Sequence, residues 1–265
     1  MSNDIWVVGN SQLHQSILAE YCSKENYLKY ADDWKNQRIS SGNFTENNRK
    51  FNFLFCNMTL LGDLSFAGNA VHHTSQMGDF VNLIDKEAKI ILIMLRGNEF
   101  AFESLVETTT PWDFNYGGIP AIEGRQLVKK NDALSHFKKA TNALIATCVL
   151  YKISFPNAAV YHIVAPPPIE SNKHIIENPE GFSLLFEKFG LRPFSVRKKI
   201  YSAMYENLST ELHRYGVETL EAPADALTES GGLRSDFASG CLHGNKNYGR
   251  SIISLLEKRN IYASL

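Results

Sequence analysis

The sequence lacks the patterns that mark several common protein classes. Its four cysteines are scattered, with neither the CxxC spacing of a zinc site nor the density of a disulfide framework. It contains neither GxGxxG nor GxxxxGK[ST], which argues against dinucleotide and P-loop nucleotide sites. Because 27 Lys and Arg stand against 28 Asp and Glu, there is no excess of positive charge to attract nucleic acid or an anionic membrane.

Long hydrophobic runs are also missing. No stretch is long enough to span a bilayer, and acidic Asp4 leads at once into the first apolar run, without a basic start or an apolar leader region. We therefore expect a cytoplasmic, unprocessed protein with no membrane span. At 265 residues and 44% hydrophobic content, the chain can bury roughly 75% of its unfolded surface in one domain over residues 1–265.

Short apolar runs alternate with longer segments of helical periodicity, which predicts a parallel sheet covered by helices on both faces. The predicted strands are 5–8, 51–56, 89–95, 158–165 and 217–221, and the predicted helices are 13–21, 131–151, 179–189, 193–215 and 249–259. Ligands of such a sheet bind at the carboxyl ends of its strands. The basic segment 192–199 is predicted to form the solvated face of a helix, and 108–124 a long ordered loop or lid.

A serine at a strand end and a distant histidine are the candidate catalytic residues. Ser11 follows the run 5–8 and precedes a helical pattern, which places its hydroxyl at the edge of the sheet and at a helix N-terminus. A serine needs a base to become a nucleophile, and His243 is the candidate base. The alternatives are that Ser11 only caps a helix and that His243 is a surface residue near a helix start.

The adjacent pair His72-His73 raises the question of a metal site. No histidine or carboxylate recurs at ligand spacing from this pair, so we favour a loop pair and expect no metal. No motif indicates a cofactor either.

Three short blocks resemble the SGNH, or GDSL-like, hydrolase superfamily. Gly9-Asn10-Ser11 stands where that family has Gly-Asp-Ser, Gly97-Asn98-Glu99 where it has Gly-x-Asn, and Ser239 to Gly249 contains the histidine of the last block and the run into a helix. The resemblance covers nearly the whole chain. It implies a three-layer α/β/α sandwich with a mainly parallel, flavodoxin-like five-stranded sheet, and a lid or loop insertion around 108–124.

The resemblance also implies a role for each matching residue. Ser11 is the expected nucleophile, and the expected oxyanion hole combines the Ser11 N–H, a glycine N–H and the Asn98 amide. Gly62 and Gly68 both follow the second strand and are candidates for that glycine, of which we favour Gly62.

The chain departs from the family at the catalytic acid. The family places an Asp three residues before the histidine, and this position is Gly240 here. We therefore expect a Ser–His dyad, in which a backbone carbonyl, or Asp236 if its loop folds back, orients the His243 imidazole.

The function that the resemblance implies is a serine esterase. It would remove a small O-acyl group, expected to be acetyl, from a small-molecule or glycan ester through an acyl-serine intermediate. One alternative is an O-acetyltransferase that passes the acyl group to a glycan hydroxyl. The other is a non-catalytic glycan-binding module, which the missing Asp favours.

Overall fold

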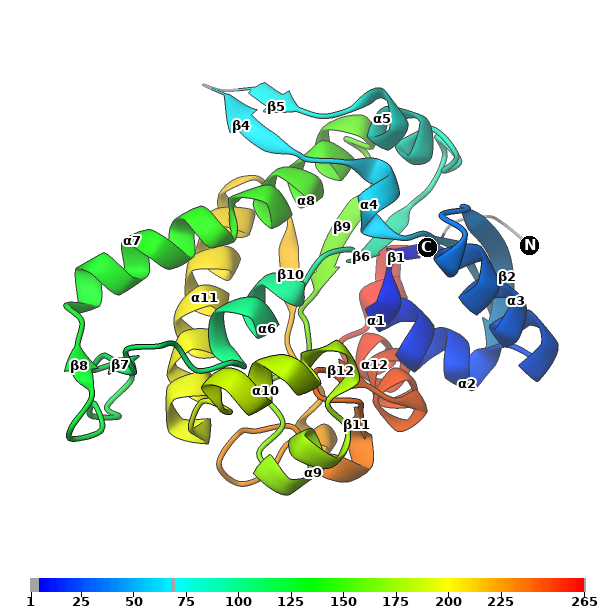
Figure 1. The fold of residues 1–265 in the computed structure, drawn as a ribbon. Coiled ribbons are helices and arrows are strands. Elements are labelled where there is room, and N and C mark those ends of the chain that lie inside the picture. Colours follow the sequence, from blue (N-terminus) through cyan, green and yellow to red (C-terminus); the bar gives the residue numbers. More distant parts are fainter. Residues whose placement is uncertain (1–4, 68–69, 265) are drawn as a thin grey trace.

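The buried apolar runs form a central sheet of six strands, flanked by helices on both faces, in the computed structural model of the protein (Figure 1). The structure describes residues 5–67 and 70–264, and for Ala67, Asn98 and Ser264 it describes the backbone alone. The strands of this sheet are β1 (Ile5–Gly9), β2 (Ser40–Glu46), β3 (Arg49–Phe55), β6 (Ile90–Met94), β9 (Ala159–Ile163) and β10 (Glu218–Leu220).

The order of the strands is β10-β9-β6-β1-β3-β2, and all but β2 run parallel. Numbered by their order along the chain, the five parallel strands lie 2-1-3-4-5, which is the flavodoxin-like order. The predicted α/β class and the five predicted strands are confirmed. The order of the strands reverses between β1 and β6, and such a switch point is where a ligand crevice forms.

The sixth strand, β2, was not predicted. It pairs antiparallel with β3 through a two-residue turn, Asn47-Asn48, in which both residues have positive φ (48° and 62°). Asparagine tolerates this conformation well, and paired positive φ values fit the tight turns of hairpins. Most of β2 is polar and exposed or half-buried, with Ser40 and Phe44 its buried residues, so it lacks an apolar run like those of β1 and β6.

Helices fill the intervals between the strands. They are α1 (Ser11–Leu13), a π-helical stretch (His14–Leu18), α2 (Ala19–Tyr21), α3 (Lys24–Lys35), α4 (Met58–Leu61), α5 (Ser75–Val81), α6 (Asn98–Ser104), α7 (Lys130–Ala140), α8 (Asn142–Ser154), α9 (Asn172–Glu177), α10 (Ser183–Phe189), α11 (Phe194–Arg214) and α12 (Lys246–Lys258). Short 3₁₀ helices span Glu180–Phe182, Ala224–Ala226, Ser235–Phe237 and Ile261–Ser264. The predicted helix 131–151 is two helices, α7 and α8, which meet at Thr141. In the described residues no helix is both long and apolar enough to span a bilayer.

Within the described residues, three small two-stranded sheets lie outside the central sheet. They are β4 (Ser65–Ala67) with β5 (Ala70–His72), β7 (Trp112–Asp113) with β8 (Gln126–Leu127), and β11 (Ala238–Ser239) with β12 (His243–Gly244). The last of these carries the candidate histidine.

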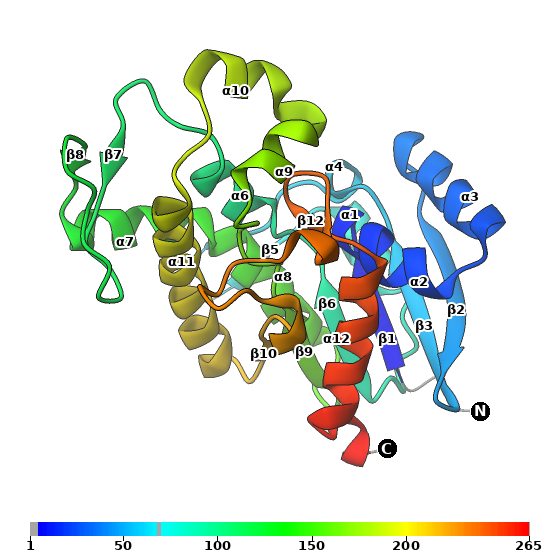
Figure 2. The same cartoon turned by 90° about the horizontal axis from the view of Figure 1, so that it is seen from below.

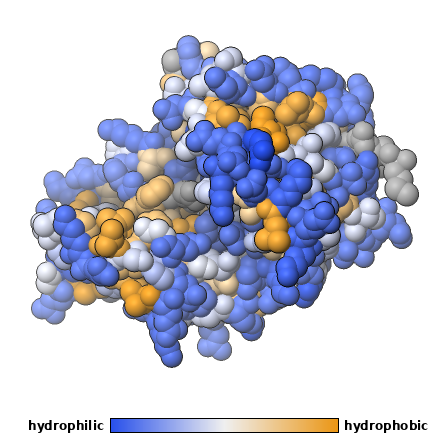
Figure 3. Space-filling view, turned by 45° about the vertical axis from the view of Figure 1, so that its right-hand side comes forward, coloured by the Kyte–Doolittle hydropathy of each residue, from blue (hydrophilic) through white to orange (hydrophobic). Residues whose placement is uncertain are grey.

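Two hydrophobic cores form, one on each face of the central sheet. The segments α1, the π-helical stretch and α2 follow one another without a gap and are called the first helix below. Along β6, Ile91 and Ile93 join a core with α5, α7, α8 and α11, while Ile90 and Leu92 join a core with the first helix, α3 and α12. Alternate residues of a strand point to opposite faces, so a fully apolar strand serves both layers. Figure 2 shows α8 and α11 on one side of the sheet and α12 on the other. On the face shown in Figure 3, hydrophilic residues dominate and the hydrophobic ones gather in separate patches.

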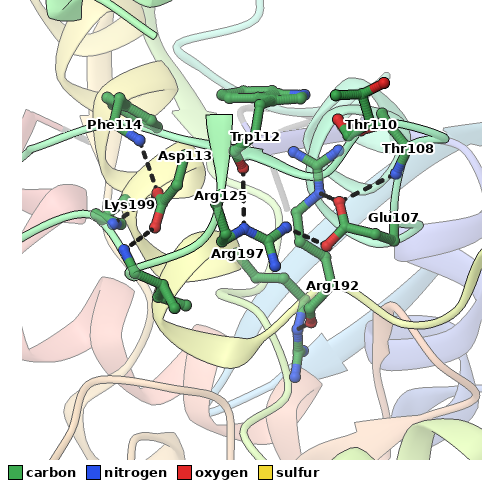
Figure 4. A network of polar contacts seen from close by, with 11 residues as sticks. Glu107, Thr108, Thr110, Trp112, Asp113, Phe114, Arg125, Arg192, Arg197 and Lys199 are labelled. Atoms are coloured by element: carbon green, nitrogen blue, oxygen red, sulfur yellow. Dashed lines mark hydrogen bonds and ion pairs between the residues drawn. The ribbon is translucent and has the colours of Figure 1, made fainter. Parts of the chain in front are cut away.

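The basic segment 192–199 is buried, so its predicted solvated face is wrong. Arg192, Arg197 and Lys199 are 2%, 0% and 1% exposed. The Lys199 ammonium lies 2.6 Å from an Asp113 carboxylate oxygen and donates to the Pro120 carbonyl. For Arg192 and Lys199 the cause is the segment 107–125, which supplies the counter-charges Glu107 and Asp113 (Figure 4). Arg197 instead donates to the Arg192 and Ile169 carbonyls and to the Asn172 side-chain oxygen.

The same contacts locate the segment that was expected to be a lid or loop insertion. Arg125 pairs with Glu107, and Glu107 also lies 3.6 Å from the Arg192 guanidinium. In Figures 1 and 2, β7 and β8 lie beside α7 and α11, across α6 from the first helix. In this structure the segment therefore does not cover Ser11.

A buried histidine makes the stability of the fold depend on pH. Burial lowers the pKa of His162, on β9, to about 4 from the usual 6.5. Between these values the unfolded chain binds more protons than the folded one, so the free energy of unfolding rises with pH across this window and levels off above it. Acidification through the window should lower the free energy of unfolding by about 3 kcal/mol.

Urea unfolding of the wild type and of His162→Leu at several pH values from about 4 to about 7.5 measures this contribution. We expect the variant to lose less of its stability on acidification. Equal pH dependence in the two proteins would contradict the prediction.

Candidate active site

Ser11 begins the first helix directly after β1. The turn requires a close approach, because a Cβ on Gly9 would overlap the Cβ of Leu13 and lie 2.9 Å from its Cδ2. The buried Asn10 caps the helix, since its side-chain oxygen accepts the Gln12 N–H at 3.4 Å. Ser11 therefore lies at the carboxyl end of β1, beside the switch point of the sheet.

The β11–β12 hairpin brings His243 to Ser11 across 232 residues of sequence. The Nε2 atom of His243 lies 3.0 Å from the Ser11 Oγ, which is hydrogen-bond distance. His243 is 9% exposed. The predicted nucleophile and base therefore meet in the structure.

Two glutamines of the first helix hold the hairpin. The Gln12 side-chain oxygen accepts the Gly244 N–H at 3.4 Å, and the Gln15 side-chain oxygen accepts the Ser239 hydroxyl at 3.1 Å. Ser239 is the cross-strand partner of His243. These bonds tie both strands of the hairpin to the helix that carries Ser11.

A carboxylate that sequence reasoning missed lies on the other side of the imidazole. The Oε1 atom of Glu180 is 3.3 Å from the Nδ1 of His243, and its Oε2 lies 3.5 Å from the Cys241 sulfur. Burial acts to raise the pKa of Glu180, but the contacts with His243 and the Cys241 thiol outweigh it, so the pKa of this carboxyl lies below its usual value. Glu180 is therefore ionised at neutral pH.

The sequence offered no spacing rule that would find Glu180. It lies 63 residues before His243, in the turn-forming run Asn178-Pro179-Glu180-Gly181, and the family's acid is expected next to the histidine. An acidic residue in a turn on the same edge of the sheet was the available signal.

The structure does not bring Asp236 to His243. Its carboxylate pairs with Arg234 at 2.8 Å, and its side chain is 58% exposed. The backbone carbonyl of Asp236 accepts hydrogen bonds from the Asn245 and Asn247 side chains, which fixes the start of α12. Within the described residues, the carboxylate that contacts the imidazole is that of Glu180.

The Gly97-Asn98-Glu99 block forms a tight turn after β6. Arg96 and Gly97 both have positive φ (65° and 103°), and the Glu99 carboxylate accepts the Gly97 N–H at 2.7 Å. The Arg96 side chain donates to the Thr147 hydroxyl at 3.0 Å, which anchors the turn to α8. Asn98 is the first residue of α6, which follows β6, the strand next to β1. Its side chain lies outside the described part of the structure.

Gly62 ends α4, after β3, with a positive φ of 69°. The end of β3 lies beside Gly9, because Phe55 pairs with Gly9 in the sheet. Gly68, the other candidate glycine, lies outside the described residues.

A small cavity adjoins the site. Its lining includes Gly97 and Leu242, which precede Asn98 and His243, together with Pro167, Ala101 and Tyr201. Neither Ser11 nor His243 lines it.

The His72-His73 pair and the cysteines were considered as possible metal ligands or disulfide partners. His73, of the pair that raised the metal question, bonds through its Nδ1 to the Thr74 carbonyl oxygen at 2.8 Å. Across the described ranges, no three His, Cys, Asp or Glu side chains are grouped to hold a metal ion. The cysteines are free, and all but Cys22 are buried.

Comparisons with models of protein families and with curated proteins found no match. Among solved structures, the chain is similar to the periplasmic domain of a lipopolysaccharide acetyltransferase from Salmonella ser. Paratyphi A, at 15% identity and a TM-score of 0.47 over 98% of this chain and 84% of that chain. A GDSL-like lipase from Bacteroides thetaiotaomicron matches at 10% identity and a TM-score of 0.44, over 99% of this chain and 89% of that chain. A family two carbohydrate esterase from Clostridium thermocellum matches at 13% identity and 0.40, over 99% of this chain and 65% of that chain.

One of these solved structures is GDSL-like, the kind that the sequence blocks resemble, and the other two are an acetyltransferase domain and a carbohydrate esterase. Identities and TM-scores this low assign no role to any residue. The function is therefore argued from the geometry of the site.

The Ser11 turn leads to a prediction about stability. Gly9→Ala forces a methyl group into Leu13, and such overpacking costs about 1–3 kcal/mol. Urea unfolding should therefore show a midpoint well below that of the wild type. Gly181→Ala is the matched control, because a Cβ there meets nothing within 4 Å. Equal midpoints for Gly9→Ala and the control would show that the turn adapts freely.

Proposed function

We propose that the protein is a serine esterase that removes a small O-acyl group from a hydroxyl through an acyl-serine intermediate. The observation that carries the proposal is the 3.0 Å contact between the Ser11 Oγ and the His243 Nε2, at the carboxyl end of β1. A nucleophile and base at this distance, at a helix N-terminus, can perform acyl transfer.

In the first half of the reaction, the Ser11 oxygen attacks the ester carbonyl as its proton passes to the His243 Nε2. A C–O bond forms and the carbonyl oxygen becomes an oxyanion. When this intermediate collapses, the bond to the leaving alcohol breaks, and His243 gives its proton to the departing oxygen. Water then repeats the sequence on the acyl-serine, which releases the acid and restores Ser11.

The oxyanion needs hydrogen-bond donors close to Ser11. We assign this role to the backbone N–H groups of Ser11 and Gly62 and to the Asn98 side-chain amide. The placement of their segments supports the assignment, because β1, β3 and β6 are neighbours in the sheet and all three residues follow their carboxyl ends.

The substrate proposed is an acetyl ester of a carbohydrate. The acetyl group is the one that the family resemblance implies. The carbohydrate part follows from the family resemblance of the sequence blocks. A panel of sugar hydroxyls added to the assay separates hydrolysis from acyl transfer, because transfer diverts the acyl group from water to the sugar.

The non-catalytic alternative loses the feature that favoured it. That feature was the missing Asp at Gly240, and the Glu180 carboxylate lies at hydrogen-bond reach of the same imidazole nitrogen. A binding module has no need of a carboxylate that contacts an imidazole which in turn contacts a hydroxyl.

A fluorophosphonate probe tests the nucleophile, because such probes label activated serines. We expect wild-type protein to carry the label on the peptide that contains Ser11, and Ser11→Ala to lose both the label and the hydrolysis of a short-chain aryl ester. Ser16→Ala, five residues along the same helix, is the control and should keep both. Wild-type activity in purified, folded Ser11→Ala would overturn the proposal.

Asn98→Ala tests the oxyanion hole. An amide that faces the developing charge acts in the transition state, so kcat should fall by about 10²-fold with a smaller change in KM. Steady-state kinetics with the same aryl ester measure both constants. A change confined to KM would make Asn98 a substrate-binding residue instead.

A further inference from the structure

We infer that Glu180 is the positioning carboxylate of this site, and that it reaches His243 from a separate segment through the space that a side chain at position 240 would otherwise fill. Its catalytic meaning rests on the proposed function. The identification of the contact itself rests on geometry alone.

The first observation is that Gly240 and Glu180 compete for one volume. A Cβ built on Gly240 would overlap the carboxylate carbon and Oε1 of Glu180. Position 240 is also the one from which an acid would be expected on the sequence resemblance. A side chain at position 240 and the Glu180 carboxylate would therefore occupy the same space, and in this structure the carboxylate fills it.

The second observation is how the carboxylate is bound. One oxygen faces the His243 Nδ1 and the other faces the Cys241 sulfur. Burial and the nearby Glu180 charge raise the pKa of Cys241 to about 12, so the thiol keeps its one proton, for which the carboxylate at 3.5 Å and the Pro179 carbonyl at 3.4 Å are the acceptors in reach. With one oxygen held by the thiol, the other is fixed toward the imidazole.

The third observation is that the segment carrying Glu180 is latched to the histidine loop. The Pro179 carbonyl lies 3.4 Å from the Cys241 sulfur, and the His174 Nε2 lies 3.1 Å from the Gly240 carbonyl oxygen. Figure 2 shows α9 next to β12, which agrees with these contacts. The latch joins two segments that are about 60 residues apart in the sequence.

The backbone of Glu180 is itself unusual. Its φ is +50°, a left-handed conformation that is strained for a non-glycine residue. Such a conformation persists when surrounding contacts over-determine it, and the latch supplies those contacts. With this backbone conformation, the Glu180 side chain reaches His243 on the hairpin.

A carboxylate at the Nδ1 holds the imidazole in the tautomer that leaves the Nε2 free to take the serine proton. It also stabilises the imidazolium that forms in the transition state. An amide in its place keeps the shape but cannot supply the charge. Glu180 thus acts through His243 and does not touch the substrate.

The first test is Glu180→Gln, with kcat and KM measured on an aryl ester. Amidation of a triad acid elsewhere lowers kcat by about 10⁴-fold, and we expect a loss of about 10³- to 10⁴-fold here with little change in KM. The acidic limb of the pH profile of kcat/KM should also move to lower pH, which a purely structural defect would not cause. The matched control is Glu177→Gln, whose side chain is 60% exposed and pairs with Lys173.

The second test exchanges the two positions. Glu180→Ala clears the shared space, and Gly240→Asp then offers a carboxylate from the hairpin, at a φ of +60° that aspartate tolerates better than most residues. We expect the double variant to be at least about tenfold more active than Glu180→Ala. Gly240→Asp alone should lower activity, because its side chain meets Glu180.

The outcomes separate this inference from the proposed function. If Ser11 takes the probe and hydrolysis depends on it, but Glu180→Gln keeps activity within about threefold of wild type, the inference is overturned and the esterase proposal stands. A large loss in Asp236→Asn would assign the role to Asp236. A folded double variant no more active than Glu180→Ala would overturn the shared-space argument.

Discussion

The docking of the β11–β12 hairpin against the first helix is the contact on which the rest of the site depends. Through it, His243 at one end of the chain comes within 3.0 Å of Ser11 at the other. Gln12 and Gln15, three residues apart on that helix, both hold the hairpin. The helix is π-helical from His14 to Leu18, directly after the serine, and such stretches are frequent at functional sites.

The layout of the sheet explains why the site forms where it does. β1 and β6 are adjacent, and the order of strands reverses between them, so the connections leave in opposite directions and open a crevice. Ser11 follows one of these strands and Asn98 the other. The two hydrophobic cores hold both strands from above and below, which gives the strand ends a rigid base.

The charged groups divide between scaffold and site. The Lys199–Asp113 pair is fully buried and ties the segment 107–125 to α11, away from Ser11. The Glu180–His243 pair is partly exposed and lies next to the serine. Removing one partner of a fully buried pair leaves an uncompensated charge, so the first pair bears on folding, while the second bears on the protonation of one imidazole.

Local patterns were sufficient for much of the fold. Of the five parallel strands, β1 and β6 could be predicted because each is a continuous apolar run, as a strand buried on both faces must be. β2 escaped prediction since an edge strand with one partner needs few apolar residues, and its turn, Asn47-Asn48, is less distinctive than an Asn-Gly pair. The basic residues at 192–199 escaped because the sequence does not show which remote segment covers them.

The sequence by itself determined the strand-to-helix turn that presents Ser11, because a buried run, a glycine and an asparagine cap act on their immediate neighbours. It also indicated His243 as the base, through the block that leads into the last helix. Only the tertiary structure decided which carboxylate faces that histidine. The choice between Asp236 and Glu180 depends on how the segment 169–190 packs against the hairpin, a contact between residues far apart in the chain that no local preference encodes.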